Sequence, residues 1–163
     1  MTRRKPSIEA AAAWIRLMRV RSRVLAAVEQ ELKKAGFPPL ASYDALLALS
    51  RAPAGELRPV ELEKRMLLPQ YATSRLIDRL VEEGLAMRRE CKADKRGQFV
   101  EITDAGRELR KKMGQAYSMA IEKHVGSKLS DADAAKLCGL LDRLGCSCNE
   151  AQALAVRDGA SAR

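Results

Sequence analysis

The segment YATSRLIDRLVEEGLAMRRECKADKRGQFVEITDAGREL (residues 71–109) holds the pattern that decides the fold. Its first part places leucine and isoleucine at helical spacing and ends at Gly84, a residue type that commonly follows the last turn of a helix. Two short runs, residues 85–91 and 97–102, then flank a charged tip and suit a two-stranded hairpin. Thr103 follows as a helix N-cap. The segment therefore predicts a helix, a β-hairpin and another helix, in that order.

The chain before this segment predicts further helices joined by tight turns. A long helix is expected over residues 7–35, with apolar residues on two faces, and Gly36 before FPPL ends it. Ser42 is expected to cap a short second helix, and Pro59 suits the first turn of a third. One apolar face of the long helix can cover its own domain, so the other requires a second surface, most simply a partner subunit.

Two helices are predicted after the hairpin. One runs from Asp104 to about residue 125, and Ser130 caps another, whose leucine stripe ends at Leu144. A helix-turn-helix followed by a β-hairpin is the winged-helix arrangement, in which the second helix of the pair lies in the major groove of DNA. The expected fold is mainly α with a small β-hairpin wing (α+β), a winged helix-turn-helix with N- and C-terminal dimerisation helices.

The amino-acid composition limits which classes of partner the protein can have. The chain has 163 residues, of which 47% are hydrophobic, so it is long and apolar enough for one domain with a real core. Thirty Lys and Arg against 21 Asp and Glu give a net charge of +9, which favours a polyanionic partner. No stretch approaches the roughly 20 apolar residues that a membrane span needs, and the first residues lack the apolar region of a signal peptide. A cytoplasmic protein without a membrane partner is therefore expected.

Four motifs in the deciding segment are similar to those of a known family. They are SRL, DRL, DKRG and ITDAGREL, at residues 74–76, 78–80, 94–97 and 102–109. In combination they resemble the MarR family of bacterial winged-helix transcription regulators, over roughly residues 40–112. The resemblance implies that the helix from Gln70 is the recognition helix, that Arg96 is the wing arginine that enters the minor groove, and that Asp94 orients it.

The same resemblance divides the chain by role. We expect an N-terminal dimerisation helix in residues 1–35, a winged helix-turn-helix DNA-binding domain in residues 36–112, and C-terminal dimerisation helices with a tail in residues 113–163. The expected function is that of a sequence-specific transcription regulator, a homodimeric repressor bound to a pseudo-palindromic operator in double-stranded DNA. A small molecule, aromatic or acidic and including acyl-coenzyme A, is expected to release it.

Candidate DNA-binding residues lie on the recognition helix and on the wing. Arginine can pair bidentately with guanine in the major groove, and the negative potential of a narrow minor groove attracts it. Because the leucine and isoleucine side of the helix faces the core, its polar side chains are expected to face outward; Arg79 is equally well explained as a solvated residue. The candidates are Gln70, Tyr71, Thr73, Ser74, Arg75, Arg79, Arg88, Arg89, Asp94, Lys95 and Arg96.

Candidate effector-binding residues lie on helices that should converge between the dimerisation and DNA-binding parts, with the pocket expected between the first, second and fifth helices. An arginine stripe on the first helix is either a solvated face or a seat for an anionic effector or a flanking phosphate. The aromatic and methionine residues are either a pocket lining or ordinary core. The candidates are Trp14, Arg16, Met18, Arg19, Arg23, Tyr43, Met113 and Tyr117.

The sequence does not favour a metal, a cofactor or an active site. His124 is the only histidine, and the CSC sequence at residues 146–148 lacks the usual Cys-x2-Cys spacing of a zinc site. No paired carboxylates, glycine-rich phosphate loop or nucleophile with a base occur at motif spacing, so no enzyme activity is expected. Two alternatives to a ligand-released repressor stay open: a redox-sensing regulator that uses Cys91 among the wing bases, and a non-specific architectural DNA-binding protein.

Overall fold

The computed structural model describes residues 5–66, 73–91 and 94–145, without the side chains of residues 91 and 94–97. The helices in these ranges are α1 (Ile8–Lys34), α2 (Leu40–Ser50), α3 (Pro59–Arg65), α4 (Thr73–Glu82), α5 (Asp104–His124) and α6 (Asp131–Asp142), with 3-10 turns at Pro53–Gly55 and Gly126–Lys128. The strands are β1 (Glu56–Leu57), β2 (Ala86–Cys91) and β3 (Asp94–Ile102). The predicted order of helices and hairpin is confirmed, and so is the mainly helical winged-helix fold.

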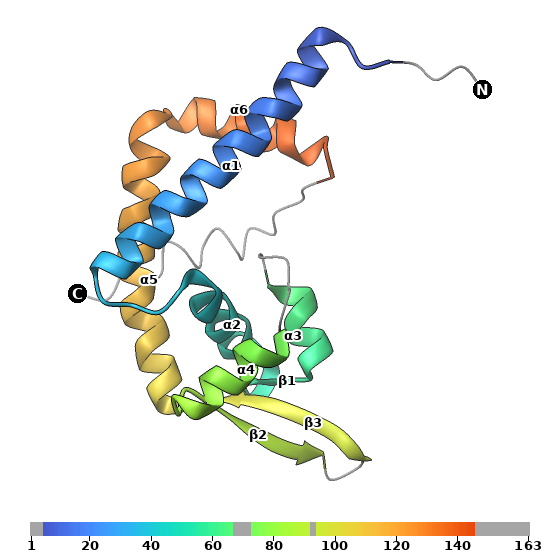
Figure 1. Ribbon diagram of the computed structural model, residues 1–163, viewed down its shortest axis with the longest axis vertical. Helices are drawn as coiled ribbons and strands as arrows, with labels where there is room; N and C mark the ends of the chain where they lie inside the picture. The colour runs from blue at the N-terminus through green and yellow to red at the C-terminus, as the bar shows by residue number, and fades with distance from the viewer. Residues whose placement is uncertain (1–4, 67–72, 92–93, 146–163) are drawn as a thin grey trace.

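The helix α5 connects the two ends of the molecule. Figure 1 shows it running from the β2–β3 hairpin to the end where α1 and α6 lie, while α2, α3 and α4 gather beside the sheet. It continues without a break through residue 112, where the sequence predicts the end of the DNA-binding domain. One hydrophobic core lies among α2, α3, α4 and the sheet, and a second lies among α1, α2 and α5. Leu109 of α5 packs against both cores and so couples the two ends.

The sheet has three strands in the order β1-β3-β2. Both of its pairings are antiparallel, and Val100 of the central strand β3 lies opposite Leu57 of β1 and Arg88 of β2. Val100 and Ile102 are buried and form the inward face of this strand. The strand β1 was not predicted, because two residues are too few to show an alternation of apolar and polar side chains.

Two of the three predicted helix caps, Thr103 and Ser130, are confirmed, and the structure adds a cap at Ser7. The side chains of Ser7, Thr103 and Ser130 each accept a hydrogen bond from the amide three residues further on, at 3.1, 3.1 and 3.2 Å. The backbone of Gly36, which has a φ of 76°, follows the end of α1 as predicted. Such caps satisfy amides that have no partner within the helix, so these three helix starts are set by local sequence.

The third predicted cap, Ser42, is wrong. The helix α2 begins at Leu40, after Pro39, which offers no side-chain cap. Instead, both carboxylate oxygens of Glu29 on α1 accept from the Leu40 amide at 3.2 Å. A carboxylate at this position also interacts favourably with the positive end of the helix dipole. Ser42 is buried in the first turn, so the start of α2 is set by a contact with another helix.

Thr103 and Gly106 join the end of α4 to the start of α5. The Thr103 hydroxyl donates to the Gly84 carbonyl at 2.8 Å, and the Thr103 amide donates to the Leu85 carbonyl at 3.1 Å. A Cβ atom at Gly106 would lie 2.1 Å from that Leu85 oxygen. Only glycine therefore allows the backbone of α5 to approach the residue that follows α4 so closely.

The substitution Gly106→Ala should lower the free energy of unfolding by about 1–3 kcal/mol, because the added methyl group meets a backbone carbonyl that cannot move aside easily. Gly139→Ala is the matched control: a Cβ atom there meets nothing within 4 Å, and alanine in a helix interior is favoured over glycine by about 0.5–1 kcal/mol. Urea denaturation of both variants measures the difference. An equal effect of the two substitutions would contradict the close approach.

Candidate DNA-binding surface

The outward face of α4 presents polar residues beside the hairpin. Ser74, Arg75, Asp78 and Glu82 are exposed on it, whereas Thr73, Leu76, Ile77 and Leu80 are buried. The outward orientation predicted for Thr73 is therefore wrong, and its side chain is 9% exposed. Thr73 stands three and four residues before Leu76 and Ile77, so it continues their inward stripe. Of the predicted contacts on the described part of this helix, Ser74 and Arg75 remain available to a ligand.

Several of the predicted contacts lie outside the described residues. Gln70 and Tyr71 precede the described part of α4. The backbone of Asp94, Lys95 and Arg96 begins the strand β3, but their side chains are outside the description. The same holds for the side chain of Cys91, the candidate for redox sensing, and for Cys146 and Cys148 in the C-terminal tail. The roles of these residues stay predictions.

Arg79 points into the protein. Its Nη2 atom donates to the Ser42 hydroxyl on α2 at 3.3 Å. Its Nε atom is buried and has no hydrogen-bond partner among the described residues. Arg79 therefore braces α4 against α2, which the sequence did not indicate because arginine at this spacing also fits a solvated face.

The neighbouring arginines Arg88 and Arg89 lie on opposite faces of the hairpin, since successive side chains of a strand alternate. On one face Arg88 donates to Asp78 Oδ1 at 2.5 Å and to Gln98 Oε1 at 2.9 Å. On the other face Arg89 pairs with Glu56 of β1, and its Nε atom lies 3.6 Å from Glu101 Oε2. Both predicted DNA contacts are thus occupied by carboxylates, although each side chain is still partly exposed.

A further cation lies beside the wing. The guanidinium carbon of Arg58, at the start of α3, lies 5.5 Å from the centre of the Phe99 ring on β3. A cation over an aromatic face is attracted by the ring quadrupole and is held near the sheet. Sequence reasoning missed Arg58, because its only local signal is its place before Pro59 at a helix start.

The predicted effector residues do not form one cluster. Tyr43 and Met113 are buried in the second core, and the Tyr117 ring lies 5.1 Å from that of Tyr43. Burial raises the pKa of both tyrosines, so their hydroxyls stay neutral over the physiological range. The other side chains of the set, Trp14, Arg16, Met18, Arg19 and Arg23, are exposed on α1.

An apolar groove of about 650 Å³ lies along α1, α5 and α6. From the predicted effector set it includes Arg16 and Tyr117. Its other lining residues are Ala13, Leu17, Val20, Arg21, Val24, Leu25, Val28, Leu40, Ile121, Val125, Leu137 and Leu141. This groove differs from the pocket expected between the first, second and fifth helices, because α6 lines it and α2 contributes only Leu40.

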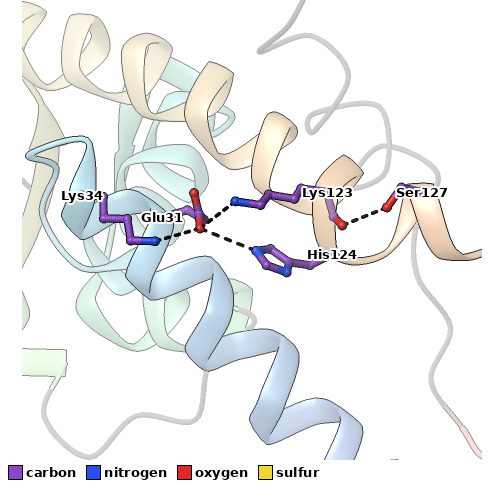
Figure 2. Close-up of polar contacts among 5 residues, drawn as sticks. All are labelled: Glu31, Lys34, Lys123, His124 and Ser127. Atoms are coloured by element: carbon purple, nitrogen blue, oxygen red, sulfur yellow. Dashed lines mark hydrogen bonds and ion pairs between the residues drawn. The ribbon is translucent and has the colours of Figure 1, made fainter.

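Glu31 fastens the end of α1 to the end of α5 (Figure 2). Its Oε1 atom accepts from Lys123 of α5 at 3.1 Å and from Lys34 at 3.4 Å, and it lies 3.8 Å from His124 Nε2. The hydrogen bond from Lys123 is the main cause that lowers the pKa of Glu31 below its usual value. Together with the Glu29 contact to α2, this pairing fixes α1 relative to two other helices.

The described part of the chain shows no group of three or more His, Cys, Asp and Glu side chains that could hold a metal ion. None of the helices described is both long and apolar enough to cross a membrane.

Comparison with known proteins agrees with this geometry. Residues 35–97 match the model of the MarR family. The resemblance to the MarR family is thereby confirmed. Comparison with curated proteins gave no match.

Solved MarR family structures share the fold. Sco3205 from Streptomyces coelicolor, a MarR family transcriptional regulator solved in complex with DNA, is 24% identical with a TM-score of 0.79, over 88% of this chain and 90% of that one. Sco5413 of the same organism is 26% identical with a TM-score of 0.72, over 85% and 94%. BpsR from Bordetella bronchiseptica, whose DNA binding is regulated by 6-hydroxynicotinic acid, is 22% identical with a TM-score of 0.74, over 88% and 100%. The MarR-like architecture thus extends well beyond the matched segment.

The substitution Tyr43→Phe should raise the free energy of unfolding by about 1 kcal/mol. The Tyr43 hydroxyl is buried without a hydrogen-bond partner among the described residues, and a buried polar group without a partner is costly. Tyr117→Phe, on the neighbouring and less buried ring, should change stability little. Thermal and urea denaturation compare them, and a clear loss of stability in Tyr43→Phe would show that its hydroxyl has a partner.

Proposed function

We propose that this MarR-like protein is a homodimeric transcription regulator that recognises a pseudo-palindromic operator and acts as a repressor released by a small molecule. The observation that carries the proposal is the exposed face of α4, with Ser74 and Arg75, beside the β2–β3 hairpin at one end of the molecule (Figure 1). A helix and a wing on one side match the major-groove and backbone or minor-groove contacts of winged-helix proteins. The fold shared with Sco3205, solved in complex with DNA, supports the same function.

The two DNA contacts should differ in kind. Arg75→Ala should weaken binding to the preferred operator by about 1–3 kcal/mol per half-site and binding to random DNA much less, because a base contact carries sequence preference. Arg96→Ala should weaken binding to all sequences. It should also reduce the slope of log affinity against log salt concentration by about one for each phosphate charge that Arg96 neutralises. Binding of both variants to operator and scrambled duplexes over a salt series measures this.

An equal loss on both duplexes for Arg75→Ala would assign that side chain to the DNA backbone. An unchanged affinity for Arg96→Ala would mean that the wing tip does not touch DNA. If the unaltered protein binds operator and scrambled DNA equally, it is an architectural DNA-binding protein and the proposed function is wrong.

A second copy of the chain is the occupant that we propose for the apolar groove. Exposed apolar side chains also lie on the same three helices, and a monomer rarely leaves large apolar surface uncovered. These side chains are Ile8, Trp14, Ile15, Met18 and Val20 on α1, Met119 on α5, and Leu137 and Leu140 on α6, with Leu144 just beyond it. In this proposal residues 1–35 and 113–163 form the dimer interface, and residues 36–112 contact DNA with half-sites roughly 10 bp apart.

Val20→Asp should dissociate the dimer, because Val20 is 57% exposed in the single chain, lines the groove and would bring a charge into the interface. Gln30→Asp, on the same helix but outside the groove, is the matched control. Light scattering at micromolar concentration should give a monomer for the first variant and a dimer for the second. A monomer for the unaltered chain would rule out the homodimer.

The effector that we propose is an aromatic acid. The support is the buried Tyr43 and Tyr117 pair where α2 meets α5, the arginines of α1, and the regulation of BpsR by an aromatic acid. Binding near this junction would change the distance between the two recognition helices of a dimer, and so the population that fits two half-sites. A panel of aromatic acids and their coenzyme A thioesters, added to the operator complex, tests this class. Release by none of them would contradict it.

A further inference from the structure

Asp78 places a negative charge on the face of α4 that we propose to meet DNA. Its side chain is 54% exposed, and it lies one turn along the helix from Arg75. A carboxylate at this position is repelled by phosphates, so its electrostatic effect alone opposes binding. The structure shows what offsets this effect: Asp78 pairs with Arg88 of β2 at 2.5 Å.

Arg88 joins the recognition helix to both strands of the hairpin. It is part of β2, its Nη2 atom donates to Asp78 of α4, and its Nη1 atom donates to Gln98 of β3. The strand register explains this geometry, because Arg88 lies opposite Val100 and Gln98 lies opposite Glu90, on the same face of the hairpin. From that face Arg88, which lies opposite the buried Val100, contacts Asp78 of α4.

We propose that Asp78 and Arg88 are positioning residues that hold the wing at a fixed place relative to the recognition helix. The inference rests on the proposed function. It explains how the contact made by α4 and the contact made by the hairpin stay at a fixed spacing along the DNA. A wing that is held in place before binding loses less conformational freedom when the protein binds the operator. A fixed wing also contacts DNA at a constant distance from the bases that α4 contacts. The pair therefore contributes preference for the operator without touching a base.

The proposal predicts opposite effects for two acids on one helix face. Asp78→Asn should weaken operator binding by the dimer about fivefold to tenfold and leave affinity for scrambled DNA unchanged or slightly higher. The reason is that a fixed wing position improves binding only when α4 also meets its preferred bases. Glu82→Gln is the matched control: Glu82 is exposed one turn further along α4, and its side chain makes no hydrogen bond or ion pair with another described residue. Its removal should raise affinity for both DNAs alike and leave their ratio unchanged.

A double-mutant cycle assigns the effect to the pair. Arg88→Ala alone should lower the ratio of operator to scrambled affinity, and combining it with Asp78→Asn should lower that ratio no further. The reversed pair, Asp78→Arg with Arg88→Asp, keeps the net charge and should recover most of the ratio. Light scattering and thermal denaturation identify any variant that is no longer a folded dimer. If a single variant fails this check, the affinity ratio of the reversed pair tests the proposal in its place.

Three results would overturn the proposal. The first is that Asp78→Asn raises affinity for both DNAs as Glu82→Gln does, which would make Asp78 a simple repulsive charge. The second is additive loss in the double variant, which would make Arg88 an independent phosphate contact. The third is a folded reversed pair without recovery. If the unaltered protein shows no operator preference, the proposed function itself fails, and this result is distinct from the other three.

Discussion

The junction at Leu85 fixes the geometry of the winged helix. Its carbonyl accepts from the Thr103 amide at 3.1 Å and lies against the backbone of Gly106. The Thr103 hydroxyl also holds the Gly84 carbonyl. One small cluster thereby sets where α4 ends and where α5 begins. These backbone contacts fix the start of the hairpin relative to α4, and the Asp78–Arg88 pair adds a side-chain contact further along β2.

Three arginines of α4 and β2 are engaged within the protein. Arg79, Arg88 and Arg89 each donate to a neighbouring protein group. Exposed ion pairs contribute little stability individually, about 0–1 kcal/mol. Their geometric effect is larger, since they tie α4 to α2 and the hairpin to α4 and β1. These arginines therefore act first within the protein, whereas Ser74 and Arg75 are exposed on α4.

Much of the fold follows from sequence because its signals are local. The caps at Ser7, Thr103 and Ser130, the glycine that ends α1 and the alternation in β3 each depend on neighbours within a few residues. Ser42 failed as a cap because the acceptor for the Leu40 amide comes from Glu29 of another helix, which no local pattern reveals.

The candidate site was predictable only in part for a related reason. The burial of Thr73 was readable, since Thr73, Leu76, Ile77 and Leu80 form one stripe at helical spacing. The partners of Arg79, Arg88 and Arg89 were not, because they come from α2, α4, β1 and β3, between 10 and 37 residues away along the chain. A sequence shows that an arginine is present, but only the tertiary structure shows whether its guanidinium group already pairs with another group of the protein.

The helix α1 is tied to two other helices by two of its carboxylates. Glu29 and Glu31 are two residues apart, so at about 100° per residue they project to nearly opposite sides of the helix. Glu29 holds the start of α2, and Glu31 holds Lys123 near the end of α5. Two residues beyond Leu40, Ser42 accepts from Arg79 of α4. Two hydrogen-bonded contacts and one short helix therefore connect α1 to α4. Because a protein interior is closely packed, the positions of these three helices depend on one another.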